Sequence, residues 1–459
     1  MNLGVLSLLP IIVLLVLVFT TRRTLLALTA ASLVGAILIG GINFPAVWIE
    51  KIQLAFMGGT VGYLFMLLAL FGILIRLLIV SDYALYFAHW LGKFANSRKK
   101  ALLLTYLLGW IICVDDYLNN MAVAASMKRI CDSHKVPRTL FGFVVNCTAA
   151  PVCVLIPIST WAVFYSGLFE DYGIVVNGSG FGAYLAGLPY LFYAWISLII
   201  CLLVIFGVFP LLGISKKDDQ YAKETGIVCT AERSADEKEI KADPESPGSQ
   251  EKANPIFFLI PMIVITALTI ITNDVLVGCL GAIFVTALML LVSRKLSIWK
   301  IFDAAFEGIA GNVQVCCVIA VALGLVEINK ATGLAEYIVA VITPVFENAS
   351  FTFPALVFAF CAAYTFSAGG FWDGSMLFMP IVVPIAKALG IDPLLSCMAL
   401  VCAATAGSTT YVAGDAVLIA SRAVDIKPIY QTKATLPYAL VSYFLTIAAF
   451  LIAGFIQQM

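Results

Sequence analysis

Charged residues are scarce in this chain of 459 residues. Asp, Glu, Lys and Arg together make up 12% of it, whereas soluble proteins carry roughly a quarter. Hydrophobic residues reach 62%, and the mean hydropathy is +1.03. The apolar stretches are long and continuous, which excludes a membrane β-barrel, whose strands alternate over about ten residues. The composition therefore predicts an all-α polytopic protein that lies in the lipid bilayer.

Motifs of enzyme and metal chemistry are missing as well. Only two histidines occur, His89 and His134, which excludes an H-E-x-x-H zinc protease. The twelve cysteines contain no C-x-x-C pair and are typical of small buried hydrophobes. Lys plus Arg and Asp plus Glu are equal at 27 each, so the net charge indicates no nucleic-acid partner. We expect a protein that is not an enzyme and carries no cofactor.

The most unusual stretch is Val114–Asn120, which holds two adjacent carboxylates and two adjacent carboxamides between apolar segments. Charged side chains at membrane depth are costly and persist where they face a cavity, an ion or each other. We expect Asp115, Asp116, Asn119 and Asn120 to bind a cation. The structural alternative is a buried pair of carboxylates that holds helix N-termini.

Two basic clusters flank this stretch, Lys93–Lys100 and Lys128–Arg138. The apolar arms between them are too short to cross about 30 Å of hydrocarbon as a helix. Positive residues favour the cytoplasmic side, and a single crossing would place one cluster outside. A re-entrant hairpin over about residues 101–133 keeps both clusters inside and brings Asp115 and Asp116 near the bilayer midplane.

The next crossing, about residues 140–169, carries Pro151 and Pro157 among Ser and Thr residues. This pattern predicts a broken helix with freed backbone groups. Arg76, near the end of an earlier span, is expected to snorkel to the surface rather than to gate. The first repeat, residues 1–213, then gives way to residues 214–254. Their Lys, Glu, Asp and Ser residues predict a solvated, mobile, cytoplasmic linker.

The second half, residues 255–459, repeats the order of the first. The acidic tip at Asp116 matches a tip at Asp373, and other short matches keep the same offset of about 250 residues. We therefore expect a second hairpin at about residues 353–390 and a second broken helix at about residues 394–420. Each half has about five crossings and one hairpin. Because five is odd, the second repeat is inverted, as in secondary transporters.

Charge sets the orientation of the two repeats. With both termini outside and the linker inside, most Lys and Arg residues between the spans fall on the cytoplasmic side. Lys51, Lys330 and Lys387 are the exceptions. The broken helices of the two halves are expected to meet at the midplane, where transporters of this architecture bind their cargo.

The tips and broken helices supply the carboxylate, carboxamide, hydroxyl and carbonyl oxygens that hard cations prefer. No Lys or Arg lies at either tip, which favours a cation over a large anion as cargo. The candidate ion- or substrate-binding residues are Asp115, Asp116, Asn119, Asn120, Asn146, Thr148, Ser159, Thr160, Trp372, Asp373, Ser375, Thr405, Ser408, Thr409, Thr410 and Asp415. The expected Na⁺ ligands are Asp116, Asn119, Thr148, Asp373 and Asp415. We prefer Asp116 to Asp115 because Asp116 matches Asp373.

Several motifs resemble those of the NhaC family of Na⁺/H⁺ antiporters. Val114–Asn119 resembles the family's D-D-Y-x-N, Thr148–Cys153 its T-A-A-P, and Pro157–Trp161 its P-I-S-S-W. The second half departs from the family pattern at Ala368–Ser375, which carries Asp373. The resemblance covers nearly the whole chain and implies an ion-coupled exchanger of the bacterial inner membrane. Relatives in this family also exchange organic acids, which leaves the cargo open.

Three functions are weighed. Desolvation and like-charge neighbours favour protonated carboxylates, so a Na⁺(Li⁺)/H⁺ antiporter is expected to share its carboxylates between cation and proton by alternating access. The alternative is a Na⁺-coupled transporter or exchanger of a small organic acid or amino acid, with Trp372 and Asp373 lining its pocket. An intramembrane aspartyl protease is disfavoured, because residues 412–415 read V-A-G-D and not G-x-G-D. The sequence leaves the oligomeric state open, a homodimer included.

Overall fold

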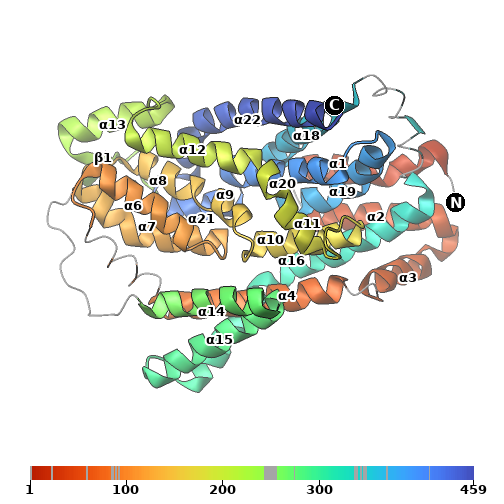
Figure 1. Cartoon of the computed structure of the whole chain (residues 1–459), viewed down its shortest axis with the longest axis horizontal. Helices are drawn as coiled ribbons and strands as arrows, with labels where there is room; N and C mark the ends of the chain where they lie inside the picture. The colour runs from red at the N-terminus through yellow and green to blue at the C-terminus, as the bar shows by residue number, and fades with distance from the viewer. Residues whose placement is uncertain are drawn as a thin grey trace.

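The computed structural model describes most of the chain. Outside the described residues lie 1–2, 22–23, 58–59, 84–86, 88–89, 91–93, 242–255, 273, 335–336, 338–339, 342–343, 345–348, 369–370, 413 and 459. Helices dominate the rest, and most of them run along the long axis of the molecule (Figure 1). The expectation of a mostly helical protein is therefore confirmed.

The first half begins with helices that pack at one edge and continues into a hairpin and an interrupted helix. Its helices are α1 Leu9–Thr21, α2 Thr24–Gly40, α3 Phe44–Met57, α4 Thr60–Val80, α6 Arg98–Ile111, α7 Asp116–Ser133, α8 Arg138–Cys147, α9 Ala150–Leu155, α10 Thr160–Asp171, α11 Gly180–Gly187 and α12 Phe192–Phe206. α6 and α7 pack against each other as the arms of a hairpin. The chain stops being helical around Thr148 and again before Ser159, next to the two prolines that prevent a continuous helix.

The second half follows a similar order. Its helices are α14 Ile256–Thr272, α15 Val275–Val292, α16 Ile298–Thr332, α18 Phe353–Ala368, α19 Phe371–Ala388, α20 Pro393–Thr410, α21 Asp415–Ala423 and α22 Pro428–Gln458. α18 and α19 both pack on α20, as α6 and α7 both pack on α8. α4 and α16, one long helix from each half, lie side by side and carry α14 and α15 at the lower edge of the molecule (Figure 1).

Five helices among the described residues are long and apolar enough to cross a membrane. They are Leu25–Met57, Arg138–Leu155, Ser350–Ser367, Pro393–Ala423 and Pro428–Gln458, and the bent pair Gly180–Tyr190 and Phe192–Phe206 makes six if it counts as one span. Several other apolar helices are shorter. These helices indicate a multi-pass membrane protein. The re-entrant course of the hairpins and the inversion of the repeat stay predictions.

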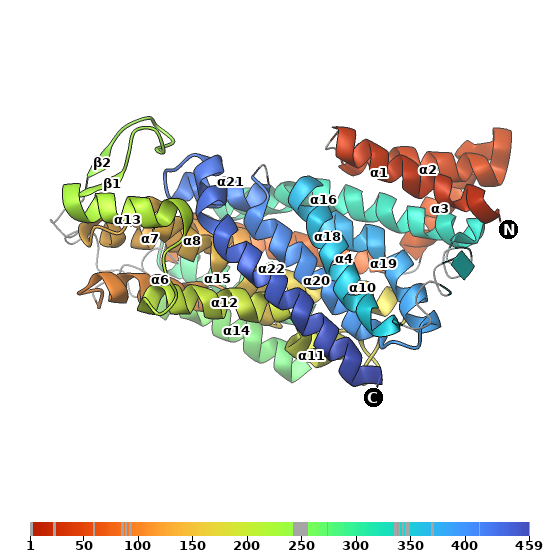
Figure 2. The same cartoon turned by 90° about the horizontal axis from the view of Figure 1, so that it is seen from above.

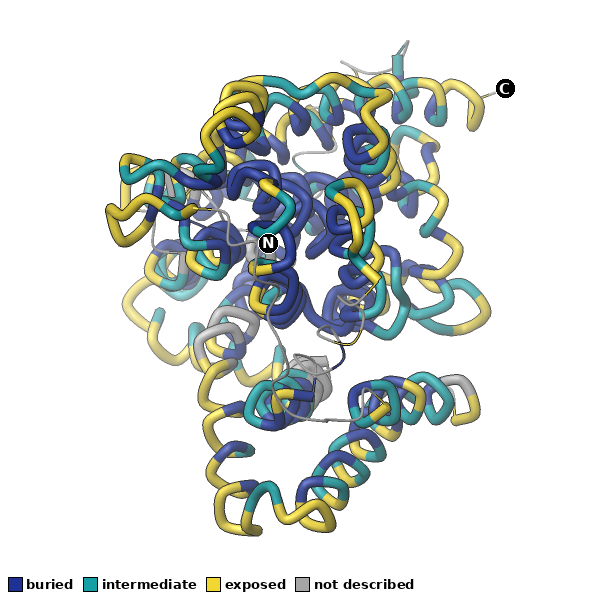
Figure 3. The backbone as a smooth tube through the Cα atoms, turned by 90° about the vertical axis from the view of Figure 1, so that its left-hand side faces the viewer, coloured by how far each residue is buried: buried dark blue, intermediate teal, exposed yellow. Residues whose placement is uncertain are grey.

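The most deeply buried elements are α8, α9, α10 and α20, which lie at the centre of the molecule. All residues of α8 and α9 are buried, and so are all residues of α20 after Pro393. Seen along the long axis, the buried segments gather in the main body, while the separate lower layer carries mixed and exposed residues (Figure 3). The interrupted helices, which carry most of the polar candidates, therefore form the core.

Residues 213–241, part of the expected solvated linker, are folded, and most of their charged side chains are exposed. They form α13 Gly213–Thr225 and the two-stranded ribbon β1 Ile227–Cys229 and β2 Ile240–Lys241, packed against α8 and α22 at one end of the molecule (Figure 2). Asp218 and Asp219 are buried there and form ion pairs with Arg233 and Arg98, respectively. Burial also raises the pKa of the Cys229 thiol to about 11. These two carboxylates thus meet arginine partners, while most other charged side chains of the segment face solvent.

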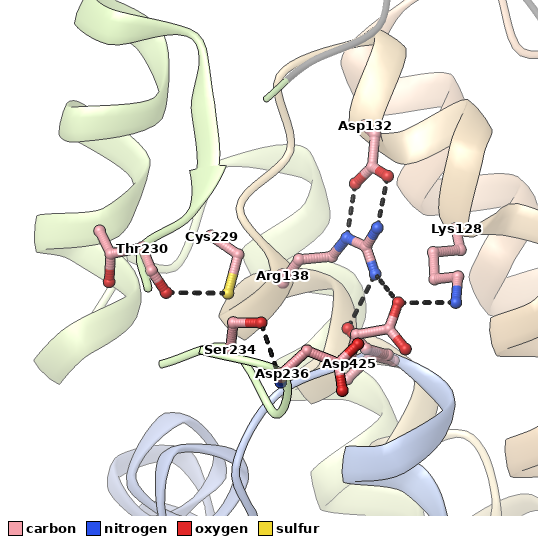
Figure 4. Close-up of polar contacts among 9 residues, drawn as sticks. Lys128, Asp132, Arg138, Cys229, Thr230, Ser234, Asp236 and Asp425 are labelled. Carbon is pink, nitrogen blue, oxygen red and sulfur yellow. Dashed lines mark hydrogen bonds and ion pairs between the residues drawn. The ribbon is translucent and has the colours of Figure 1, made fainter. Parts of the chain in front are cut away.

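A cluster of ion pairs joins the two halves at the same end (Figure 4). Arg138 donates from Nε and Nη2 to the two carboxylate oxygens of Asp132, at 2.6 Å each. Its Nη1 donates to Asp425 at 3.1 Å and to the carbonyl of Val424 at 2.8 Å, and Lys128 donates to Asp425 at 2.7 Å. The base of α7 and the start of α8 are thereby fastened to the loop between α21 and α22.

Candidate functional site

The tip of the first hairpin is built around the N-cap of α7. The carboxylate Oδ1 of Asp115 accepts hydrogen bonds from the backbone N–H groups of Tyr117 and Leu118, at 3.0 Å each. An Asp in this position accepts hydrogen bonds from backbone N–H groups that would otherwise be unpaired. Its negative charge also interacts favourably with the partial positive charge of the helix N-terminus. Its Oδ2 accepts a longer hydrogen bond, 3.4 Å, from the hydroxyl of Thr160. Asp115 therefore acts as the cap that fixes where α7 begins.

Asp116, the first residue of α7, is 1% exposed. Its Oδ1 accepts a hydrogen bond of 3.2 Å from the indole N–H of Trp161 on α10. Its Oδ2 is buried and has no hydrogen-bond partner among the described residues. The carboxylate is thus held in place on one side and left open on the other.

Asn119 and Asn120 follow Asp116 by three and four residues, which places all three on one face of the helix. Both carboxamides are fully buried. Asn119 donates to the carbonyls of Gly109 and Ile112 at 2.7 Å each, so its Nδ2 is used. In the described part of the chain, its Oδ1 and both polar atoms of Asn120 lack partners. One turn of α7 therefore presents several unpaired oxygen atoms.

The arm α6 touches the break between α8 and α9 at a glycine. A Cβ on Gly109 would lie 2.5 Å from the hydroxyl oxygen of Thr148, so only glycine allows this approach. Asn119 of α7 bonds the carbonyl of Gly109, and Thr148 contacts the same glycine. Both residues therefore pack against the same short stretch of α6. The Thr148 hydroxyl donates within its own helix, to the carbonyl of Val144 at 2.9 Å.

The N-terminus of α10 faces the hairpin tip. Ser159 caps this helix by accepting a hydrogen bond of 3.1 Å from the N–H of Ala162. The N–H of Thr160 donates to the carbonyl of Val114 at 2.9 Å. Because helix N-termini carry partial positive charge, α10 supports the carboxylates of Asp115 and Asp116 that lie against it.

The second half reaches this site through α21. The helix packs on α7 and begins at Asp415. Asp415 is exposed, whereas Asp116 is buried. The structure therefore packs two helices from opposite halves, each of which begins with a predicted acid, against each other.

The end of α20 is held by side chains of the first half and of α22. Asn146 donates to the carbonyl of Thr409 at 2.7 Å, and the hydroxyls of Tyr193 and Thr409 lie 3.0 Å apart. Thr410 pairs with Tyr443 at 3.0 Å. These contacts position the backbone just before the break between α20 and α21.

The remaining candidates of the second half have varied surroundings. Thr405 donates to the carbonyl of Val401 within its own helix, and the buried Ser408 hydroxyl has no partner in the described residues. Ser375 lies 2.6 Å from the hydroxyl of Tyr165 on α10. The side chains of Trp372 and Asp373 lie outside the described part of the structure, so their roles stay predictions.

Sequence reasoning missed the aromatic side chains that support these groups. Trp161 and Tyr165 are fully buried, and each bonds a site residue, Asp116 and Ser375 respectively. The signal was an indole and a phenol with polar tips in the helix after Pro157. The guanidinium of Arg76, which is expected to snorkel, pairs with Glu307 on α16 at 2.5 Å, and the snorkelling itself stays a prediction.

No group of three or more His, Cys, Asp or Glu side chains with metal-binding geometry occurs among the described residues. The polar atoms at the hairpin tip are instead a mixture of carboxylate, carboxamide, hydroxyl and carbonyl oxygens. Such a donor set fits a hard monovalent or divalent cation better than a soft metal.

Comparison with known proteins gives a family and a fold. The family model described as Na⁺/H⁺ antiporter family matches residues 152–455. An uncharacterized protein of Haemophilus influenzae is 25% identical over 488 residues, which cover 98% of this chain and 91% of the relative. The crystal structure of the YdaH transporter of Alcanivorax borkumensis matches with a TM-score of 0.61 and 12% identity, covering 90% of this chain and 89% of that one. MtrF of Neisseria gonorrhoeae matches with a TM-score of 0.43 and 13% identity, over 90% and 84% of the two chains.

Proposed function

Because the chain belongs to the Na⁺/H⁺ antiporter family, we propose that it exchanges Na⁺ or Li⁺ for H⁺ by alternating access. The family and the fold make it a transporter and not an enzyme. The ion specificity and the exchange mechanism are the proposed part. We place the protein in a bacterial inner membrane, with both termini outside.

The buried face of α7 carries this proposal. Asp116 Oδ2, Asn119 Oδ1 and Asn120 Oδ1 are buried oxygen atoms without partners in the described residues. A buried carboxylate without compensation costs far more than a neutral or paired one. Asp116 must therefore hold either a proton or a cation, and the neighbouring carboxamide oxygens are suited to a cation. One carboxylate that alternates between these two occupants couples Na⁺ to H⁺.

The geometry favours Asp116 over Asp115 as the ligand. One oxygen of Asp115 is engaged by the two backbone N–H groups that it caps. Asp116 leaves an oxygen without a partner among the described residues, and α21 of the other half, which begins at Asp415, packs on the same helix. Thr148 and Asp373 remain proposed ligands.

The spacing of helices supports a repeat. α7, α8 and α10 begin at Asp116, Arg138 and Thr160, and α19, α20 and α21 begin at Phe371, Pro393 and Asp415, 255 residues later in each case. We propose that these sets form inverted repeats whose hairpins are re-entrant.

The charge distribution supports the orientation. Arg98, Lys128 and Arg138 gather with the folded linker at one end of the molecule, and the chain termini lie toward the other end (Figure 1). Basic residues favour the cytoplasmic side, so we assign the linker end to the cytoplasm.

Proton movement in proteoliposomes tests the proposal. The protein is reconstituted around a pH-sensitive dye, a pH gradient is imposed, and Na⁺ or Li⁺ is added without any organic solute. The wild type should move protons and Asp116→Asn should not, while both remain monodisperse. Asp303→Asn, the same chemical change at an exposed position of α16, is the control. A wild type that moves no protons on cation addition contradicts antiport.

A second candidate function is Na⁺-coupled transport or exchange of a small organic acid or amino acid. The observation that favours it is a cavity of about 270 Å³ beside the hairpin tip, lined by Asp115 and Thr160 on one side and by Arg76 and Glu307 on the other. A bare cation needs no space of this size.

A further inference from the structure

The cavity beside the hairpin tip lies between two layers of the molecule. α4 and α16 form one wall, and α7 and α10 form the opposite wall. Its polar lining consists of Arg76, Glu307, Asp115 and Thr160, and its volume is about 270 Å³. Pockets for drug-sized ligands begin at about 300 Å³, so this one suits a solute of a few carbon atoms.

One wall offers a cationic group. The Nε and Nη2 atoms of Arg76 both donate to the same oxygen of Glu307, at 2.8 and 2.5 Å. The described residues give Arg76 Nη1 and the second oxygen of Glu307 no partner. The Arg76 side chain is 39% exposed, so it can meet a solute. A guanidinium with free N–H groups is a strong carboxylate receptor.

The opposite wall offers an anionic group beside aromatic rings. Asp115 Oδ2 accepts only the 3.4 Å hydrogen bond of Thr160 from the described residues, which leaves it room for a stronger donor. The side chains of Tyr117 and Phe164 also line the cavity. A carboxylate together with aromatic faces is a favourable setting for an ammonium group.

We propose that this cavity binds a small α-amino acid, with its carboxylate on Arg76 and its ammonium group on Asp115. A simple carboxylic acid would leave Asp115 without an ammonium group to bind, and a simple amine would bring no carboxylate to the N–H groups of Arg76 that Glu307 leaves unused. The inference rests on the proposed ion site, because Asp115 precedes Asp116 directly and caps the helix that carries the cation ligands. A solute bound there shares its wall with the cation, which supplies the coupling.

Binding to the purified protein tests the assignment without requiring transport. Thermal unfolding in detergent is followed with each of the twenty amino acids, and with the amine and the carboxylic acid that share each side chain, in saturating NaCl. A ligand at a hundred times its dissociation constant stabilises by about 2.7 kcal/mol. We expect at least one amino acid to raise the melting temperature by several degrees, and its amine and acid analogues to give no comparable shift.

Variants then place the ligand in this cavity. Arg76→Lys keeps the ion pair with Glu307 but loses the bidentate geometry, so the amino acid affinity should fall at least tenfold. Asp115→Asn keeps the helix cap and should also lower affinity at least tenfold. Asp303→Asn should bind as the wild type does. Unchanged affinity in both cavity variants overturns the assignment.

The remaining outcomes separate this inference from the proposed exchange. If no amino acid stabilises the protein, or if an amine or acid analogue binds as tightly as the amino acid, the zwitterion site is wrong. The Na⁺-driven proton movement of the same preparation, measured with no amino acid present, reports on antiport alone. Amino acid binding without that movement keeps the cavity site and removes the antiporter.

Discussion

The two helix pairs α6–α7 and α18–α19 are arranged alike along the chain and differ in the polarity of their side chains. α7 and α19 begin 255 residues apart and pack on corresponding core helices. The first turns of α7 carry Asp116, Asn119 and Asn120 with unpaired buried oxygens, whereas α19 continues from Ser375 into a buried apolar run through Phe378. Ser375 is bonded across the halves to Tyr165. In their described side chains the two helices thus differ: α7 presents buried oxygen atoms without partners among the described residues, and α19 presents a packing surface.

The base of each hairpin gives the largest expected difference in stability. Asp132 at the end of α7 pairs with buried Arg138, and removal of one partner from a buried ion pair costs about 3–5 kcal/mol. Because Asp425 still pairs with Arg138, Asp132→Ala should lower the free energy of unfolding by about 3 kcal/mol, the lower end of that range, measured by thermal unfolding in detergent. Lys387→Ala changes the exposed base of α19 and should cost less than about 0.5 kcal/mol. Equal losses would show that the second hairpin is anchored as firmly as the first.

The buried carboxamide of Asn120, which has no partner among the described residues, should lower the stability of the protein and support ion transport. Asn120→Leu removes a buried polar group that lacks partners in the described residues, and such groups cost about 1–3 kcal/mol. The variant should melt at a higher temperature than the wild type and lose at least tenfold in Na⁺-driven proton movement. Ser408→Ala, which removes an unpaired buried hydroxyl from α20, is the matched change in the other half. A less stable Asn120→Leu protein would mean that the carboxamide serves packing and not the ion.

Helix capping gives a smaller difference between the halves. Asp115 accepts two backbone hydrogen bonds at the start of α7, and Asp392 accepts one, of 2.9 Å, at the start of α20. Loss of such a cap costs about 1 kcal/mol. Asp115→Ala should thus destabilise slightly more than Asp392→Ala in thermal unfolding, while Asp115→Asn should keep the wild-type stability. If Asp115→Asn is as unstable as Asp115→Ala, the negative charge of Asp115, and not its capping hydrogen bonds, stabilises the start of α7.

The hydroxyl between α10 and α19 should have the smallest effect. Tyr165→Phe removes the 2.6 Å contact with Ser375, and one such hydrogen bond contributes about 1 kcal/mol. The melting temperature should fall by a few degrees, and Na⁺-driven proton movement should persist. Tyr193→Phe is the comparison, because Thr409 keeps acceptors in its own helix. Complete loss of transport in Tyr165→Phe would place the second tip in the ion path.

Features that depend on nearby residues could be predicted from the sequence. Asp115 caps the start of a helix, and the helix is interrupted beside Pro151 and Pro157. Both features are predictable because capping and proline effects act over a few residues. The expected match of Asp116 with Asp373 stays a prediction, because the side chain of Asp373 lies outside the described part of the structure.

Features that depend on distant residues could not be predicted. Arg76 and Glu307 are 231 residues apart, and the Arg138–Asp425 pair spans 287 residues. The linker's charge indicated solvent, but Asp218 is buried against Arg233 of the same segment, and Asp219 is buried against Arg98 of α6. Composition reports how many charges a segment has and does not report where their partners lie.

Exchange of radioactive Na⁺ across proteoliposomes tests the central claim most directly, namely that Asp116 holds the cation. With equal Na⁺ and pH on both sides, no net movement occurs, and tracer uptake reports only ion binding and the alternation of the loaded site. The wild type and Asp303→Asn should exchange tracer at similar rates, and Asp116→Asn should fall to the rate of empty vesicles while its melting temperature stays close to the wild type. Undiminished tracer exchange by a folded Asp116→Asn protein would contradict the account.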